Sequence, residues 1–114
     1  MTKSKRPASP AGVGAAARRL WNQVLERYDL DEHERALLAE TVRTVDNLER
    51  LDVVVRRDGV VLEDGRPNPA LVESRQLRIQ LARLITALRL PEDAVTDGRP
   101  QRRGVRGVYA MRGA

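Results

Sequence analysis

Two long stretches of this chain repeat apolar residues at helical spacing, and a short segment rich in helix-breaking residues separates them. The stretches cover residues 32–57 and 69–89, and the segment between them contains two Asp-Gly pairs. A chain of 114 residues buries only a modest share of its surface when it folds alone, so two long helices leave part of their apolar surface uncovered. The sequence therefore predicts a long antiparallel helical hairpin that associates with partner chains.

The first long helix has signals at both ends. Asp31 can accept the free amide hydrogens at a helix start while Glu34 bonds back to it, which is a capping-box arrangement. Gly59 can leave the helix in a left-handed conformation, after two arginines that suit the helix dipole. The main stripe steps by four and three residues and consists of Leu37, Thr41, Thr44, Leu48, Leu51 and Val55. This period favours pairing with another long helix.

The second long helix has Asn68 as its cap and Pro69 in the first helical position, where a missing amide hydrogen costs nothing. Pro91 ends it, because the residue before a proline avoids the helical conformation. Its stripe consists of Leu77, Leu81, Leu84 and Leu88. Arginines at positions 75, 78, 83 and 89 interrupt the stripe, and a solvated face is favoured over a basic strip as their interpretation. The loop before this helix is expected to form either a very short β-hairpin at Asp64-Gly65 or an irregular turn.

A shorter helix is expected over residues 14–28, with Trp21 as a packing anchor in its apolar face. Residues 1–13 are expected to form a disordered basic arm and residues 94–114 a disordered basic tail, because neither has bulky apolar residues at regular spacing. The chain is thus predicted to be all-α, with three helices in an oligomerisation domain over residues 14–93. The residues expected to pack between subunits are Leu37, Leu48, Leu51, Val55, Leu77, Leu81, Leu84 and Leu88.

The net charge of +5 comes from the two ends of the chain. Residues 1–19 contain five basic and no acidic side chains, and residues 97–114 contain five arginines and one aspartate. Flexible basic segments can neutralise phosphates without a shaped surface, so these ends predict DNA binding. The candidate contacts are Lys3, Lys5, Arg6, Arg18, Arg19, Arg102, Arg103 and Arg106. The alternative is that the tails only keep an oligomer in solution.

Several kinds of chemistry have no support in the sequence. Cysteine is absent, His33 is the single histidine, and no Gly-rich phosphate loop is present. The acidic residues around His33 suit the start of a helix and need no metal ion to explain them. We therefore expect no enzyme activity, no cofactor and no metal. No apolar run approaches the length of a membrane helix, so a soluble, cytoplasmic protein without membrane contact is expected.

Several short segments of this sequence, taken in their order along the chain, resemble the small subunit of phage terminases. These pieces are Ala-Arg-Arg-Leu-Trp at 17–21, Tyr-Asp-Leu-Asp at 28–31, the long helix centred on Asp-Asn-Leu at 46–48, Arg-Asp-Gly-Val at 57–60, Asn-Pro-Ala-Leu at 68–71, and Leu-Arg-Leu-Pro at 88–91. Together they span about two thirds of the chain and leave out both tails. The resemblance implies a ring-shaped homo-oligomer that takes part in viral genome packaging.

In that role the protein would recognise double-stranded viral DNA, in the cytoplasm of the infected bacterial host. It would deliver the DNA to the terminase large subunit, which carries the motor and nuclease activities. Two alternatives stay open. One is a small helix-turn-helix DNA-binding regulator that reads DNA through Arg35 or Arg43, although the turn between the first two helices lacks the usual glycine. The other is a helical interaction adaptor with no nucleic-acid role.

Overall fold

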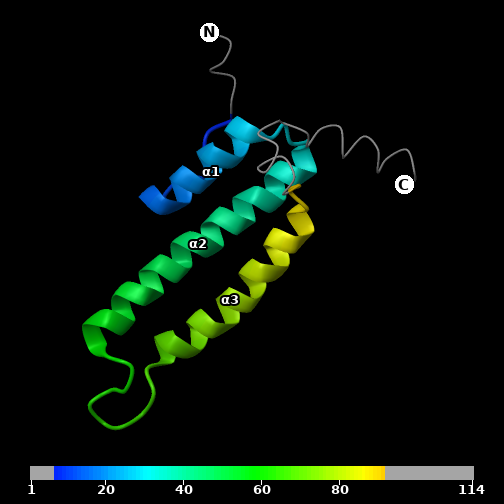
Figure 1. Cartoon of the computed structure of the whole chain (residues 1–114). Coiled ribbons are helices and arrows are strands. Elements are labelled where there is room, and N and C mark those ends of the chain that lie inside the picture. Colours follow the sequence, from blue (N-terminus) through cyan, green and yellow to red (C-terminus); the bar gives the residue numbers. More distant parts are fainter. Residues whose placement is uncertain (1–6, 92–114) are drawn as a thin grey trace.

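The computed structural model describes residues 7–91. They form three helices, α1 (Ala15–Arg27), α2 (Glu32–Asp58) and α3 (Pro69–Leu88), and no strand occurs among these residues. The prediction of an all-α fold with three helices is confirmed. α2 and α3 lie side by side with opposite directions, and α1 lies against the N-terminal half of α2 (Figure 1).

The helix ends lie where the local signals predict them. At the start of α2 the Glu34 carboxylate accepts the backbone N–H of Asp31 over 2.7 Å, which completes the capping box. At its end Gly59 has a positive φ of 93°, a conformation that costs a residue with a side chain more than it costs glycine. Local sequence therefore determines the length of α2.

Hydrogen bonds of the Asn68 side chain close the loop between α2 and α3. The Asn68 side chain, 3% exposed, accepts the N–H of Ala70 over 2.9 Å and donates to the carbonyl oxygen of Gly59 over 2.8 Å. The loop has an isolated antiparallel bridge between Val61 and Pro67 in place of paired strands. One buried amide thus caps α3 and also holds the end of α2.

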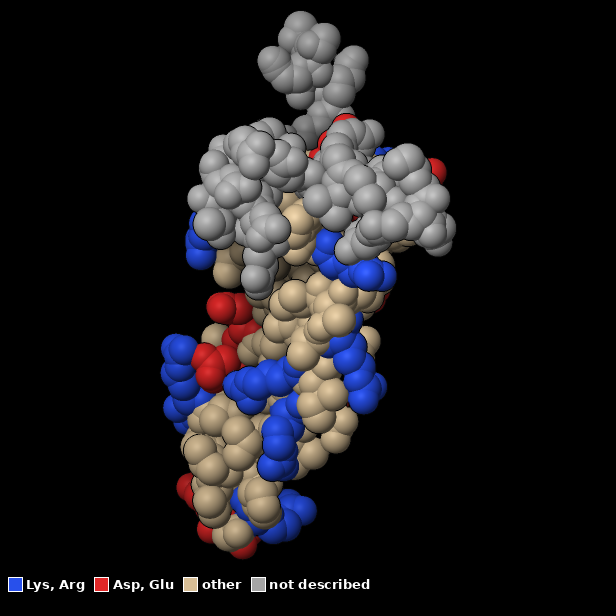
Figure 2. Space-filling view, turned by 45° about the vertical axis from the view of Figure 1, so that its right-hand side comes forward, with Lys and Arg blue, Asp and Glu red and all other residues tan. Residues whose placement is uncertain are grey.

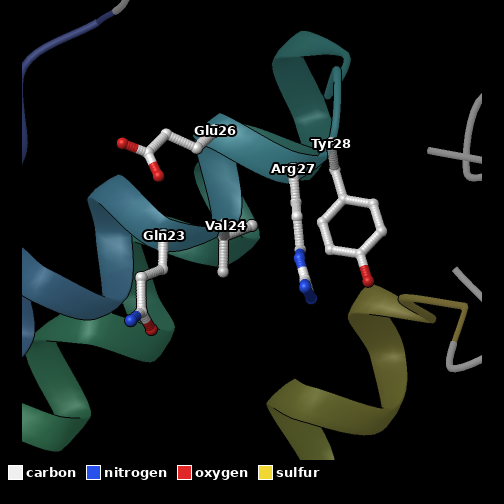
Figure 3. Close-up of a pocket in the computed structure, with 5 residues that line it drawn as sticks. All are labelled: Gln23, Val24, Glu26, Arg27 and Tyr28. Atoms are coloured by element: carbon white, nitrogen blue, oxygen red, sulfur yellow. The ribbon is translucent and has the colours of Figure 1, made fainter. Parts of the chain in front are cut away.

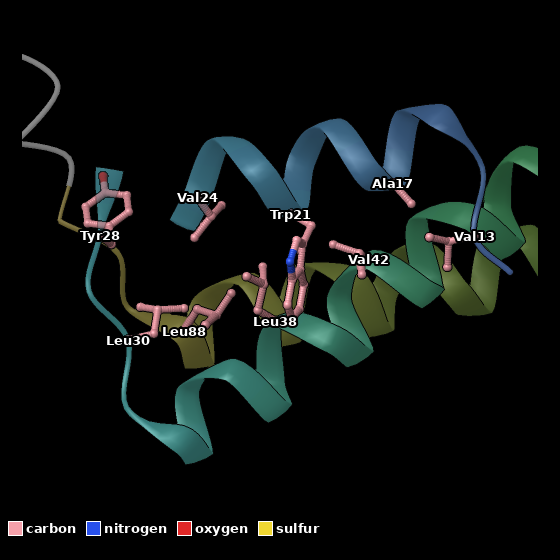
Figure 4. Packing of buried hydrophobic residues seen from close by; sticks show 9 residues of the cluster. All are labelled: Val13, Ala17, Trp21, Val24, Tyr28, Leu30, Leu38, Val42 and Leu88. Carbon is pink, nitrogen blue, oxygen red and sulfur yellow. The ribbon is translucent and has the colours of Figure 1, made fainter. Parts of the chain in front are cut away.

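The apolar core lies where α1 packs on the upper part of the hairpin. Trp21 is 4% exposed and packs in one cluster with Leu38 and Val42 of α2 and Leu88 of α3 (Figure 4). The prediction that Trp21 is a packing anchor is confirmed. Its indole nitrogen donates to the carbonyl oxygen of Pro7 over 3.0 Å, and its burial in the core leaves the ring unavailable for stacking on a base.

Residues 7–13 correct the expected boundary of the N-terminal arm. The sequence assigns residues 1–13 to a disordered segment, but Val13 is buried in the core and the carbonyl oxygen of Gly12 accepts a hydrogen bond from Arg50 over 2.9 Å. The Asp46 carboxylate accepts the N–H of Gly14 over 2.8 Å and pairs with Arg50 over 3.0 Å. These contacts hold the chain before α1 on the middle of α2, and the rest of the expected arm lies outside the described residues.

Small hydroxyl side chains lie at the contact between α2 and α3. Thr41, Thr44 and Ser74 are buried, and each donates to the carbonyl oxygen four residues earlier in its own helix. Their polar atoms are therefore satisfied without partners on the opposite helix. The apolar stripe residues around them are half-buried, apart from Leu88, which is buried.

Tyr28 connects the end of α1 to the chain that follows α3. Its hydroxyl donates to the carbonyl oxygen of Pro91 over 3.1 Å, joining the end of α1 to the chain after α3. Pro91 excludes helix at Leu90, and the chain leaves α3 at Arg89 in a left-handed conformation with φ of 53°. Within the described part of the chain, none of the helices combines the length and apolar character that a membrane crossing requires.

Candidate nucleic-acid interface

Two of the predicted DNA contacts lie within the described residues. Arg18 and Arg19 are exposed in the first turns of α1. The Arg18 guanidinium donates to the carbonyl oxygen of Val13 over 2.8 Å, whereas Arg19 makes no hydrogen bond or ion pair with a described residue. The other candidates lie outside the described residues, and these are Lys3, Lys5, Arg6, Arg102, Arg103 and Arg106.

Four of the five arginines of α2 have acidic partners beside them, whereas Arg35 donates to a backbone carbonyl oxygen. Most of these partners stand three or four positions earlier, where helical side chains meet. The pairs are Arg43 with Glu40, Arg50 with Asp46, Arg56 with Asp52, Arg57 with Asp58 and, in the loop, Arg66 with Asp64. The hydrogen bond from Arg57 holds the pKa of Asp58 below its ordinary value, and the same bond raises the pKa of Arg57. The positive charge of α2 is therefore largely compensated within the chain.

The arginines of α3 are exposed and have no such partners. Arg75, Arg78 and Arg83 make no hydrogen bond or ion pair with any residue in the described range. Glu73 is the single acidic residue of α3, and it stands three or four positions from none of them. Arg75 and Arg78 are themselves three positions apart, a spacing at which like charges repel. Figure 2 shows positively charged side chains along the face that α3 presents.

An open pocket of about 400 Å³ lies along the C-terminal turns of α1. Arg27 extends from α1 toward the end of α3 in this pocket, next to the Tyr28 ring (Figure 3). It makes no hydrogen bond or ion pair with a described residue. The described lining residues are Gln23, Val24, Glu26, Arg27 and Tyr28, which include no histidine and no hydroxyl nucleophile other than a phenol. The pocket therefore adds a further arginine that makes no ion pair with a described residue.

A second groove, of about 340 Å³, opens between α2 and α3 beyond the start of α1. Leu48 and Leu81 line it, together with Arg78 on one side and Asp52 on the other. The residues expected to pack between subunits (Leu37, Leu48, Leu51, Val55, Leu77, Leu81 and Leu84) are half-buried within one chain, and Leu88 is buried. Their part in assembly stays a prediction, because the hairpin itself covers much of their surface.

Other large apolar residues are more exposed than this stripe. They are Val53, Val60, Val61, Val72, Ile79 and Ile85, with exposed fractions from 41% to 58%. Most of them lie on the lower hairpin and its loop, where α1 does not reach (Figure 1). The sequence prediction left these residues out of the subunit contact because it followed the seam between the two helices. On α3 their signal in the sequence is that Val72, Ile79 and Ile85 lie on rows beside the leucine stripe.

The arrangement of α1 and α2 differs from a helix-turn-helix. In that motif the two helices cross at about 90–120°, whereas α1 runs antiparallel alongside α2, with its start at Asp46 and its end near Leu30 (Figures 1 and 4). The two arginines that a helix-turn-helix would use to contact bases also form hydrogen bonds within the chain. Arg35 donates to the carbonyl oxygen of Leu30 over 3.1 Å, and Arg43 pairs with Glu40 over 2.7 Å. The geometry therefore does not favour major-groove reading by α2.

The acidic cluster at the start of α2 serves the helix cap. Ligand atoms of Asp31, His33 and Glu34 lie within 4.8 Å of one another, at an exposed or half-exposed position. The Glu34 carboxylate already accepts the N–H of Asp31. The cap thus explains why these side chains converge.

Comparison with protein-family models, with curated proteins and with solved structures finds no match for this chain. The functional interpretation therefore depends on the geometry and charge described above, together with the order of sequence pieces that resembles small terminases.

Proposed function

We propose that this chain is a terminase small subunit, a homo-oligomeric ring protein that binds double-stranded viral DNA and delivers it to the terminase large subunit. The proposal depends mainly on the exposed arginines that have no acidic partner among the described residues, which are Arg19 on α1 and Arg75, Arg78 and Arg83 on the hairpin. Uncompensated cations on a rigid surface suit contact with phosphates. A ring would multiply these contacts and so raise the overall affinity.

The exposed apolar residues support the assembly part of the proposal. Val53, Val60 and Val61 are each at least 54% exposed, on the last turns of α2 and the loop that follows it. Branched apolar residues that recur along an extended surface are typical of protein contacts. In a ring of identical subunits, one such surface meets a different surface of the neighbouring copy.

DNA retention at several salt concentrations tests the nucleic-acid role. The full chain is expected to bind a mixed-sequence duplex with an affinity that falls steeply as salt rises. A variant in which Lys3, Lys5, Arg6, Arg18 and Arg19 are all replaced by glutamine is expected to bind more weakly and with a flatter salt dependence. Absence of binding by the unmodified chain at low salt would exclude the terminase role. An assembled protein that does not bind DNA would be the adaptor, and a dimer with tight, site-specific binding would be the regulator.

A further inference from the structure

We propose that Arg75, Arg78 and Arg83 of α3 form the surface that binds the phosphate backbone of duplex DNA. This inference depends on the proposed function and places its DNA contact on the hairpin, in addition to the basic ends of the chain. The bound chemistry is a regular array of phosphates, and no base is read by these residues.

The first reason is that the charge on α3 is not compensated. Exposed arginines of α2 stand beside acids that accept their hydrogen bonds, such as Arg43 with Glu40 and Arg56 with Asp52. On α3 the positions three and four residues away from each arginine hold apolar, small or uncharged polar residues, or another arginine. Arg78 shares the groove between α2 and α3 with Glu49 and Asp52 but makes no ion pair with either of them. The guanidinium groups of all three arginines can therefore still donate hydrogen bonds to an external anion.

The second reason is the spacing of the three side chains. Arg75 and Arg83 are eight positions apart, which is about 12 Å along the helix axis. Duplex DNA carries one negative charge for about 1.7 Å of its axis, so a segment of that length presents about seven phosphates. The three guanidinium groups can therefore each reach a separate phosphate.

The third reason is how the side chains are distributed around α3. Arg78 and Arg83 are separated by about 140° around the helix, with Arg75 between them, since successive residues are about 100° apart. A single carboxylate would be bound by arginines that converge on one point. Arginines on both flanks of an exposed helix instead suit an extended polyanion that passes along it.

Three matched variants of the full chain test this surface. The first replaces Arg75, Arg78 and Arg83 by glutamine, and the second replaces them by lysine. The control replaces Arg43, Arg56 and Arg57 of α2 by glutamine, which removes the same charge from arginines that are paired within the chain. Binding to one mixed-sequence duplex is measured over a range of salt concentrations, with the native mass and the helical circular dichroism of each variant.

The α3 glutamine variant is expected to lose about 2.7 from the slope of log affinity against log salt per bound subunit, from three contacts at about 0.9 each. Its affinity should fall on the order of tenfold or more, with unchanged mass and helicity. The lysine variant and the α2 control should keep a slope close to that of the unmodified chain. A retained slope in the α3 glutamine variant would overturn the inference and leave the proposed function standing.

Two other outcomes are also decisive. If the native mass of the α3 glutamine variant changes, the face is a contact between subunits, and the inference is overturned. If the unmodified chain binds no DNA at low salt, both the inference and the proposed function fail.

Discussion

Asp46 joins the chain before α1 to the middle of α2 through one carboxylate. One of its oxygens accepts the N–H of Gly14, the other pairs with Arg50, and Arg50 in turn donates to the carbonyl oxygen of Gly12. The Asp46 residue is 7% exposed, whereas the Arg50 side chain is 66% exposed. This side chain therefore holds the start of α1 on the middle of α2.

Replacing Asp46 by alanine is expected to reduce the free energy of unfolding by about 1–3 kcal/mol, because the N–H of Gly14 loses its acceptor. Urea unfolding followed by Trp21 fluorescence measures the loss. Glu49→Ala provides the control, since Glu49 is exposed on the same helix and has no ion pair with a described residue. Its effect should stay within about 0.5 kcal/mol. Equal stabilities of the two variants would show that Asp46 does not hold α1.

The uncompensated arginines of α3 show what could be predicted for the candidate site. The missing acids three and four positions away are visible in the sequence, so the unpaired state of Arg75, Arg78 and Arg83 could have been predicted. To predict that these arginines are exposed, one must also know which side of α3 packs on α2. The leucine stripe indicates that side. Pairing with acids elsewhere in the chain could not be excluded from sequence, because such contacts depend on tertiary packing.

The helices themselves were predictable because their end signals are local. The caps at Asp31 and Asn68 act through residues at most three positions away, so sequence spacing alone identifies them. The docking of residues 7–14 was not predictable in the same way. Its bond from Gly14 to Asp46 joins residues 32 positions apart. Nothing in the composition of a segment rich in Ala, Gly and Pro indicates such a partner.

Asn68→Ala is expected to lower the free energy of unfolding by about 1–3 kcal/mol, through loss of a helix cap and of the donor to Gly59. Asn68→Asp should fall between this variant and the unmodified chain, because a carboxylate keeps the bond from Ala70 but cannot donate to the Gly59 carbonyl oxygen. Urea unfolding measures both. A fully stable Asn68→Ala variant would contradict the role of this amide in closing the loop.

The molecule as a whole is a helical hairpin that α1 covers along part of its length. The upper hairpin contributes Leu38, Val42 and Leu88 to a core with α1, whereas Val53 and Val61 farther down are more than half exposed. A hairpin of this kind gains stability when another chain covers the lower part. The proposed association with further copies would supply that cover.

Leu81→Asp is expected to abolish assembly, because a neighbouring subunit that covers the groove between α2 and α3 would bury the new carboxylate, at a cost of several kcal/mol. Leu48→Asp on the opposite wall should act in the same way. Gln80→Asp introduces the same charge at an exposed position of α3 and should leave the assembly unchanged. Native mass and circular dichroism distinguish loss of assembly from loss of helix. An unchanged mass for Leu81→Asp would remove this stripe from the subunit contact.

The native mass of the full chain at micromolar concentration tests the proposed ring most directly. One subunit has a mass of 12.8 kDa. We expect a single species whose mass is an integer multiple of this value and larger than that of a dimer, as a closed ring of identical subunits requires. A species of 12.8 kDa with no larger form would contradict the proposed ring.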